Sequence, residues 1–292
     1  MPTPSTPRST AKVFKFLQEK GILHDGNHHQ PTEKASDEVL LRVHTQEYLD
    51  SLRHSSTVAR IAELSILKRV PNFLLQWKFL NPMRWATAGT LMGVDLALEH
   101  GWAINLSGGY HHAKADRSSG FCFFADINLA ADRFWTQHKQ QGKVMVIDLD
   151  AHQGNGFEDI FKRDPRVDVF DMYNGDIYPM DLPAAQYIRW KFPLPSGTGE
   201  LTYINTLQKN LPSAIEASKP DLIIYNAGTD PYEKDPLGGL RVSAAGIVLR
   251  DQFVFQQART RKIPILMLLS GGYHRDSASI IASSITNLIE NL

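Results

Sequence analysis

Several features are scarce in this sequence of 292 residues, and each scarcity excludes a class of protein. Cys122 is the single cysteine, so no disulfide forms within the chain and a reducing compartment is expected. No apolar run approaches the roughly 18–20 residues that cross a bilayer, and residues 1–10 lack the apolar core of a signal peptide. The 31 basic residues balance 31 acidic ones, so no overall field attracts nucleic acid or an anionic membrane. We therefore expect a soluble cytoplasmic protein without a membrane span and without direct nucleic-acid binding.

Short apolar segments alternate with amphipathic helical patterns along most of the chain. Strands are expected at 102–106, 144–149, 167–170, 222–225 and 265–269, and helices at 12–20, 84–100, 126–138, 156–162, 201–218, 244–261 and 277–290. Strand and helix in alternation with short connections predict an α/β protein whose mostly parallel sheet is covered on both faces. Because no linker, internal repeat or low-complexity boundary interrupts the pattern, we expect a disordered tail at 1–11 and a single domain at 12–292.

The segment 144–156 carries the strongest chemical signal. Four apolar residues lead into Asp148, Asp150 and His152, a pattern typical of a buried parallel strand that ends in a polar turn. Asp150 and His152 are two residues apart, so in extended backbone they leave the same face, as two ligands of one cation must. Buried carboxylates need a neutralising partner. The segment is therefore either a metal site or an ordinary polar turn, and the other strand ends must decide between them.

Four separate strands are expected to end in polar, glycine-rich loops. In open parallel sheets, ligands bind outside the carboxyl ends of the strands, so these loops meet at one edge. The side chains that would gather there are His111 and His112, Asp150 and His152, Asp230, and Tyr273. Complementary hydrolytic groups on four loops favour a catalytic site over four unrelated turns.

The pattern divides these side chains into ligands and catalysts. Asp150, His152 and Asp230 supply two carboxylates and one imidazole, which leave a coordination position open, as catalytic zinc requires. Ferrous iron suits the same ligands, so the metal is Zn²⁺ or Fe²⁺.

Two histidines and a tyrosine would perform the proton chemistry at this edge. His111 and His112 suit general base and acid work near neutral pH, and Tyr273 offers an O–H to an oxyanion. Asp148 and Asn155 would set the tautomers of the two histidines. The set describes amide hydrolysis by a metal-activated water.

Five sequence blocks resemble the signature blocks of the zinc-dependent histone deacetylases. They are residues 108–113, 119–122, 148–156, 226–230 and 270–273, and the likeness extends from about residue 12 to residue 292. Gln153, Gly154 and Asn155 after the ligand histidine resemble the class IV branch in particular. The resemblance implies the three-layer arginase/deacetylase-like fold, with a roughly eight-stranded parallel sheet flanked by helices. It also implies hydrolysis of an N-acyl-lysine in a protein or peptide, or of a related acyl amide.

The resemblance also assigns residue roles. It gives zinc to Asp150, His152 and Asp230, makes His112 the base toward water with His111 as its proton-shuttling neighbour, and makes Tyr273 the oxyanion donor. The positions that wall the acyl-lysine channel are Gly120, Phe121, Tyr178 and Leu237. A structural K⁺ site would involve Asp148, Asp150, His152, Asp171 and Met172.

The sequence departs from the family pattern in two places. Asn155 stands where many deacetylases have an aspartate, so His112 would lose a charged partner, as it does in class IV members. Class IV relatives are associated with removal of long fatty-acyl groups from lysine. The resemblance therefore leaves two activities open, removal of acetyl groups or removal of long fatty-acyl groups. Family members also carry an N-terminal strand and loop before the first helix, and residues 1–8 do not resemble them. We therefore expect a domain that lacks this strand.

Three alternative functions remain to be compared with N-acyl-lysine hydrolysis. Binuclear manganese amidinohydrolases share the fold but need aspartates where this chain has Gly154 and Tyr232. Hydrolysis of small acylated amines such as acetylpolyamines uses the same catalytic set. A catalytically weak binding module would keep the pocket without turnover, although Tyr273 and all three ligands are present. The oligomeric state is open.

Overall fold

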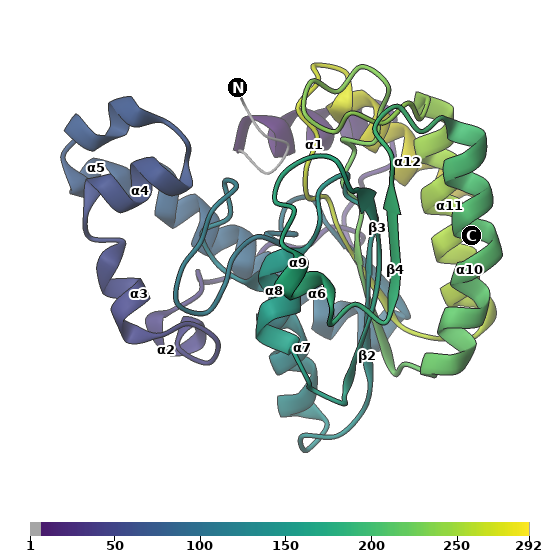
Figure 1. Ribbon diagram of the computed structural model, residues 1–292, viewed down its shortest axis with the longest axis horizontal. Helices are drawn as coiled ribbons and strands as arrows, with labels where there is room; N and C mark the ends of the chain where they lie inside the picture. The colour runs from purple at the N-terminus through teal and green to yellow at the C-terminus, as the bar shows by residue number, and fades with distance from the viewer. Residues whose placement is uncertain (1–6, 292) are drawn as a thin grey trace.

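Residues 7–291 are described by the computed structural model, and residues 1–6 and 292 lie outside the described part. Within residues 7–291, six strands form one parallel sheet in the order β1-β6-β5-β2-β3-β4 (Figure 1). The strands are β1 (Trp102–Asn105), β2 (Val144–Asp148), β3 (Val167–Asn174), β4 (Trp190–Leu194), β5 (Leu222–Asn226) and β6 (Ile265–Leu268). The α/β class and the parallel sheet are confirmed, but the expectation of about eight strands is wrong for the described residues.

Helices cover both faces of the sheet, which gives three layers. The helices are α1 (Pro7–Glu19), α2 (Asp37–Leu40), α3 (Gln46–Ser51), α4 (Ser55–Ile61), η1 (Ser65–Arg69), α5 (Asn72–Leu75), η2 (Gln76–Leu80), α6 (Asn81–His100), α7 (Asp126–Gln137), α8 (Asn155–Phe161), α9 (Leu182–Ala185), α10 (Glu200–Ser218), α11 (Ala244–Thr260) and α12 (Ser277–Asn291). Helices α10, α11 and α12 lie on one side of the strands, and α7 and α8 lie on the other (Figure 1).

Strand β2 shows why the sheet forms at the centre of the protein. All five of its residues are buried, so both of its faces must be apolar down to its final aspartate. Met145 and Ile147 pack into the core under α10, α11 and α12, whereas Val144 and Val146 pack into the core under α6, α7 and α8. Because alternate side chains of β2 pack into the two cores, its carboxyl end at Asp148 lies between the two helical layers.

A helical lobe of α2 to α5 stands beside the sheet and supports the loop that carries the histidine pair (Figure 1). Its apolar core includes Phe123 and Phe124 of that loop. The Tyr48 hydroxyl donates to the Phe123 carbonyl at 2.7 Å, and the Ala125 N–H donates to His44 Nε2 at 2.9 Å. The lobe therefore fixes residues 110–125 by apolar contacts and by two buried hydrogen bonds.

The predicted elements differ from the structure in several places. Helix α1 begins at Pro7, so residues 7–11, expected in a disordered tail, are helical, whereas residues 1–6 lie outside the described part. Proline favours the first turn of a helix because its missing N–H has no partner there. Strand β4 was not predicted, because Pro193 and its alternating exposure suit only an edge strand. The segment 65–80 holds η1, α5 and η2, short helices for which the sequence analysis names no element.

No helix in the described residues 7–291 is both long and apolar enough to cross a membrane.

Candidate active site

The three predicted metal ligands converge at the carboxyl edge of the sheet. Because β2 and β5 are adjacent and parallel, with Asp148 opposite Asn226, the residues that follow them meet in one place. His152 Nδ1 lies 3.1 Å from Asp150 Oδ1 and 3.0 Å from Asp230 Oδ2. One ligand atom from each of the three residues lies within 4.8 Å of the others, and all three residues are buried.

The charges of this cluster favour a cation. His111 and His152 outweigh burial and hold the pKa of Asp150 well below its usual range. Burial, together with the negative charge of Asp150, raises the pKa of Asp230 to about 7. Two carboxylates that repel each other in a buried site are neutralised by a divalent cation, and their oxygens and the imidazole nitrogen suit zinc or iron. Asp150, His152 and Asp230 therefore fit a zinc or ferrous ion.

Backbone and hydroxyl donors fix the two carboxylates. Ser270 Oγ donates to Asp150 Oδ2 at 2.9 Å, and the Gly271 N–H donates to the same oxygen at 2.8 Å. The Ala151 N–H donates to Asp230 Oδ1 at 2.8 Å. A Cβ at Gly228 would overlap the Asp150 carboxylate, so the backbone approaches the ligands more closely than any other residue permits. Protein donors thus hold the carboxylates of both predicted ligands in place.

His111 lies against a buried carboxylate that favours its protonated form. Its Nδ1 lies 2.8 Å from Asp148 Oδ2, and Asn226 Nδ2 donates to Asp148 Oδ1 at 3.0 Å. Burial opposes protonation of His111, but the carboxylates of Asp148 and Asp150 outweigh it and raise the pKa of His111 to about 9. Asp148 therefore lies where the sequence pattern placed a partner of this imidazole.

His112 lies against His111 but has a neutral partner. The two rings are 4.1 Å apart between centroids, and His112 Nδ1 lies 2.9 Å from Asn155 Oδ1. Burial and the neighbouring His111 and His152 hold the pKa of His112 well below its usual range. His112 is therefore neutral, and its Nε2 is free to accept a proton because Nδ1 is the nitrogen that faces the amide oxygen.

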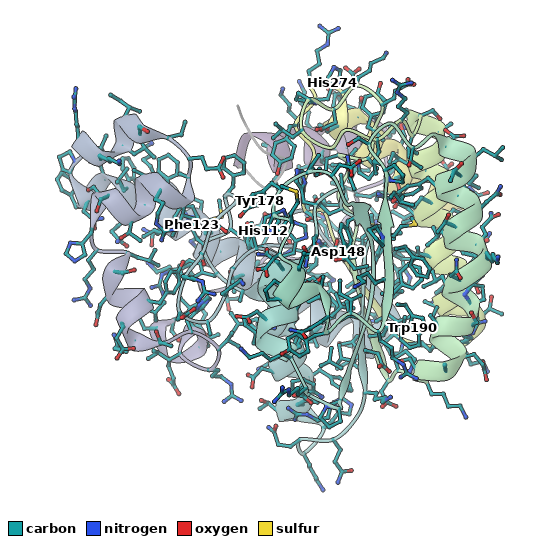
Figure 2. The ribbon with its side chains drawn as sticks, viewed as in Figure 1. His112, Phe123, Asp148, Tyr178, Trp190 and His274 are labelled. Atoms are coloured by element: carbon teal, nitrogen blue, oxygen red, sulfur yellow. The ribbon has the colours of Figure 1, made fainter. Side chains whose placement is uncertain are left out.

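Aromatic side chains lie near His112 and Tyr273. The Tyr178 ring stands edge-on to His112 with centroids 5.1 Å apart, and Phe121 and Tyr273 are 6.0 Å apart. Figure 2 shows Tyr178 and His112 between the helical lobe and the sheet. A Cβ at Gly120, which has a positive φ of 54°, would overlap the His112 ring. Gly120 and Tyr178 thus lie against His112, and Phe121 lies near Tyr273.

The loop after β5 carries Leu237 and a residue that the sequence did not single out. Leu237 is partly exposed, and its N–H donates to Asp235 Oδ1 at 2.9 Å. The other carboxylate oxygen of Asp235 accepts from the Tyr273 N–H at 2.6 Å, so this side chain ties the Leu237 loop to the tyrosine. The Tyr273 ring lies 6.3 Å from the His152 ring, and burial, with Asp150 and Asp230, raises the pKa of Tyr273 well above its usual range. Tyr273 therefore keeps its proton.

The predicted potassium residues form a second buried acidic group. Asp171 lies opposite Asp148 in the register of β2 and β3, and Met172 follows it in the buried strand. Asp171 Oδ2 accepts from the Gly154 N–H at 3.0 Å, while its Oδ1 is buried and has no protein partner among the described residues. Burial, with Asp148 and Glu158, raises the pKa of Asp171 well above its usual range.

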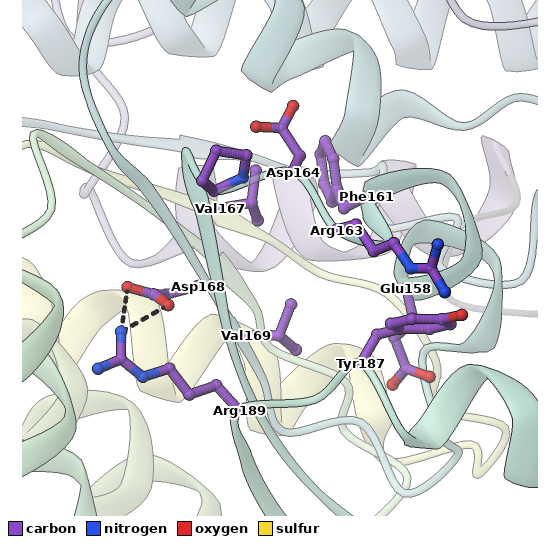
Figure 3. A pocket seen from close by; sticks show the side chains of 10 residues that line it. Glu158, Phe161, Arg163, Asp164, Val167, Asp168, Val169, Tyr187 and Arg189 are labelled. Atoms are coloured by element: carbon purple, nitrogen blue, oxygen red, sulfur yellow. Dashed lines mark hydrogen bonds and ion pairs between the residues drawn. The ribbon is translucent and has the colours of Figure 1, made fainter.

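A pocket of about 290 Å³ lies apart from the histidine pair, beside α8 and β3 (Figure 3). Glu158 lines it, and Arg189 and Asp168 form an ion pair there with a nitrogen–oxygen distance of 2.9 Å. Since none of the predicted ligands or catalytic residues lines this pocket, it is not part of the candidate active site.

Comparisons with known proteins identify the family of this chain. A model of the histone deacetylase domain matches residues 3–289. Histone deacetylase 2 of Arabidopsis thaliana is 48% identical over 277 residues, which cover 95% of this chain and 71% of that protein. Histone deacetylase 6 of Caenorhabditis elegans is 28% identical, over 99% of this chain and 32% of that protein. The crystal structure of the HDA15 HD domain shares the fold, with a TM-score of 0.77 at 23% identity over 99% of this chain and 82% of that one. The chain therefore belongs to the histone deacetylase family of hydrolases.

Proposed function

We propose that this protein is a zinc-dependent lysine deacylase that cleaves the amide of an N-acyl-lysine side chain. The observation that carries the proposal is the convergence of Asp150, His152 and Asp230 beside two buried histidines and Tyr273. Zinc bound by the three ligands would lower the pKa of a water and polarise the acyl carbonyl. Family membership supports the hydrolase, and the donor set supports the metal.

The histidine pair performs the proton transfers in this proposal. His112 presents an unprotonated Nε2, since its Nδ1 faces the Asn155 oxygen, and it accepts the proton of the attacking water. His111, kept protonated beside Asp148, stabilises negative charge that develops next to it. A proton then passes from the pair to the departing lysine amine, so that the lysine and the free acid are released.

Tyr273 supplies the remaining contact with the reacting group. Its phenol stays protonated and donates a hydrogen bond to the oxyanion of the tetrahedral intermediate. The Asp235 carboxylate holds the Tyr273 backbone by the 2.6 Å hydrogen bond, so the tyrosine loop is fixed to the channel wall.

Phe121 and Tyr178 form the walls of the proposed lysine channel, with Gly120 at the turn and Leu237 at the mouth. The aliphatic stem of a lysine fits between two aromatic rings because it is apolar and narrow. The exposed side chains near Tyr178 and Leu237 include the apolar Met180 and Leu182 and the charged Asp176, Glu233 and Lys234.

A structural K⁺ ion is proposed beside Asp148 and Asp171. The unpaired buried oxygen of Asp171 and the adjacent Asp148 carboxylate fit a hard monovalent cation held by oxygen atoms. Met172 follows Asp171 in β3, Asp150 and His152 follow the end of β2, and these three residues complete the expected set. Such an ion would neutralise acids that lie below the metal ligands.

Two finer assignments stay predictions. The class IV branch is proposed from Gln153 and Asn155 after the ligand histidine, and the acyl group is proposed to be acetyl or a longer fatty-acyl chain. The cytoplasmic location inferred from the single cysteine also stays a prediction.

Hydrolysis of a peptide panel tests the proposed function. Zinc-loaded protein would be incubated with acetyl-, octanoyl- and myristoyl-lysine peptides and with acetylspermidine. We expect chelator-sensitive cleavage of at least one peptide, and the preferred acyl length separates deacetylase from defatty-acylase. Cleavage of acetylspermidine alone would replace the proposal with the acetylpolyamine alternative. No cleavage by folded, metal-loaded protein would contradict catalysis.

A further inference from the structure

Asn155 connects His112 to a carboxylate that the sequence motifs do not contain. Asn155 Oδ1 lies 2.9 Å from His112 Nδ1, and Asn155 Nδ2 donates to Asp181 Oδ2 at 3.0 Å. Lys114 Nζ donates to the same Asp181 oxygen at 2.9 Å. The four side chains form one line from the proposed base to a lysine, and Asn155 is buried within it.

The chemistry of the carboxylate decides the orientation of the amide. An ionised aspartate only accepts hydrogen bonds, whereas an asparagine presents an acceptor oxygen and a donor NH₂. The NH₂ of Asn155 must therefore face Asp181, which turns the amide oxygen toward His112. Only a protonated Nδ1 can donate to that oxygen, so the proton of neutral His112 sits on Nδ1 and Nε2 keeps its lone pair.

Further hydrogen bonds hold Asp181 in position beside Asn155. The Gln153 side chain bonds its backbone in both directions: Gln153 Nε2 donates to the Asp181 carbonyl at 3.0 Å, and the Asp181 N–H donates to Gln153 Oε1 at 3.0 Å. Its second oxygen, Oδ1, accepts from the Ala184 N–H at 3.1 Å at the start of α9. Burial opposes ionisation of Asp181, but the bonds from Asn155 and Lys114 outweigh it and lower its pKa, so it remains an acceptor.

We propose that Asp181, paired with Lys114, is a positioning residue that orients the Asn155 amide and thereby fixes the tautomer of His112. This inference rests on the proposed deacylase function for its effect on turnover. Although Asn155 is neutral, His112 is still linked to a carboxylate in this chain. That carboxylate belongs to Asp181, which contacts the Asn155 amide and not the histidine itself.

Asp181→Asn is the sharpest single change because it alters one atom. If the new amide keeps its oxygen toward Ala184, its NH₂ faces two donors, Asn155 and Lys114. If it turns over, the Ala184 cap is lost. In the first case Asn155 loses its acceptor, and in the second a neutral amide oxygen replaces the carboxylate and accepts more weakly, so we expect kcat to fall by about 10- to 100-fold with little change in KM. Asp159→Asn is the matched control, since the Asp159 carboxylate lies 4.0 Å from Lys114 Nζ but makes no side-chain hydrogen bond to Asn155 among the described residues, and it should keep wild-type kcat.

An exchange of the two side chains gives the decisive comparison. Asn155→Asp alone places two carboxylates against each other and should also lower kcat by about 10-fold or more. The double variant Asn155→Asp/Asp181→Asn restores one carboxylate and one amide in the opposite order, and its kcat should return to within about fivefold of wild type. A double variant no faster than Asn155→Asp, or full activity in Asp181→Asn, would overturn the inference.

Nuclear magnetic resonance of ¹⁵N-histidine protein tests the same inference without turnover. The two ring nitrogens of His112, identified by comparison with His112→Gln, report which one carries the proton in zinc-loaded protein. We expect protonated Nδ1 in wild type and Asp159→Asn, and a mixture of tautomers in Asp181→Asn. If wild type cleaves no substrate but shows this difference, the proposed function fails and the positioning role stands. One unchanged tautomer in all three proteins contradicts the positioning role.

Discussion

Acidification should loosen the helical lobe from the histidine loop through one residue, His44. This side chain is buried, with Nδ1 3.3 Å from the Ala115 carbonyl and Nε2 accepting from the Ala125 N–H. The two bonds require a neutral ring protonated on Nδ1, because a proton on Nε2 would meet the Ala125 N–H. Burial, which the contacts with backbone carbonyls only partly offset, lowers the pKa of His44 from 6.5 to about 4.

The sign and size of the effect follow from proton linkage. Between pH 6.5 and pH 4 the unfolded chain binds a proton at His44 that the folded chain does not, so stability falls as the pH falls through this window. From pH 7 to pH 5 the loss assigned to His44 amounts to about 2 kcal/mol of unfolding free energy. That is a large share of the marginal stability of a typical domain.

Urea unfolding at pH 7 and pH 5, followed by tryptophan fluorescence, measures this loss. His44→Gln keeps an acceptor for the Ala125 N–H but does not titrate, so its stability should fall by about 2 kcal/mol less than that of wild type over the same interval. His54→Gln, an exposed histidine of the same lobe, is the control and should behave as wild type. Equal losses in wild type and His44→Gln would refute the reasoning.

Three further substitutions test the proposed site. Tyr273→Phe should lower kcat by about 10²- to 10³-fold with metal content unchanged, because one oxyanion donor is lost, and unchanged turnover would remove the tyrosine from the mechanism. Asp230→Asn should reduce bound zinc well below one ion per chain by elemental analysis, so a full complement would contradict the ligand set. Gly228→Ala would push a methyl group into the Asp150 carboxylate and should cost about 100-fold in turnover. Gly199→Ala, whose Cβ meets nothing within 4 Å, should not, and equal rates in these two variants would refute the packing reasoning.

The sequence predicted the central strands and the edge of the sheet where the site lies. Strands such as Val144–Asp148 are buried on both faces, and their unbroken apolar runs need no tertiary information to be seen. Strand Trp190–Leu194 was missed because its residues alternate in exposure and include Pro193. Edge strands are defined by the neighbour they pair with, which a local pattern does not contain.

The site divides in the same way. Motif residues such as His112 and Asp230 could be proposed from the sequence because each follows a predicted strand. Asp181 and Asp235 were not found, because each acts through a contact that only the folded chain creates. Asp181 lies 26 residues from Asn155, and Asp235 lies 38 residues from Tyr273. In a sequence, a lone aspartate beside a proline or a short helix suggests an ordinary turn. Only the folded structure shows which donor groups its carboxylate accepts from.

Metal removal and restoration would test the proposed metallohydrolase most directly. Protein stripped with a chelator and then dialysed would be assayed on its best acyl-lysine peptide before and after addition of one equivalent of Zn²⁺ or, without oxygen, Fe²⁺. We predict that activity is lost on chelation and restored by one equivalent of metal, and that Asp230→Asn is not restored. Full activity in the metal-free protein would contradict the proposed site.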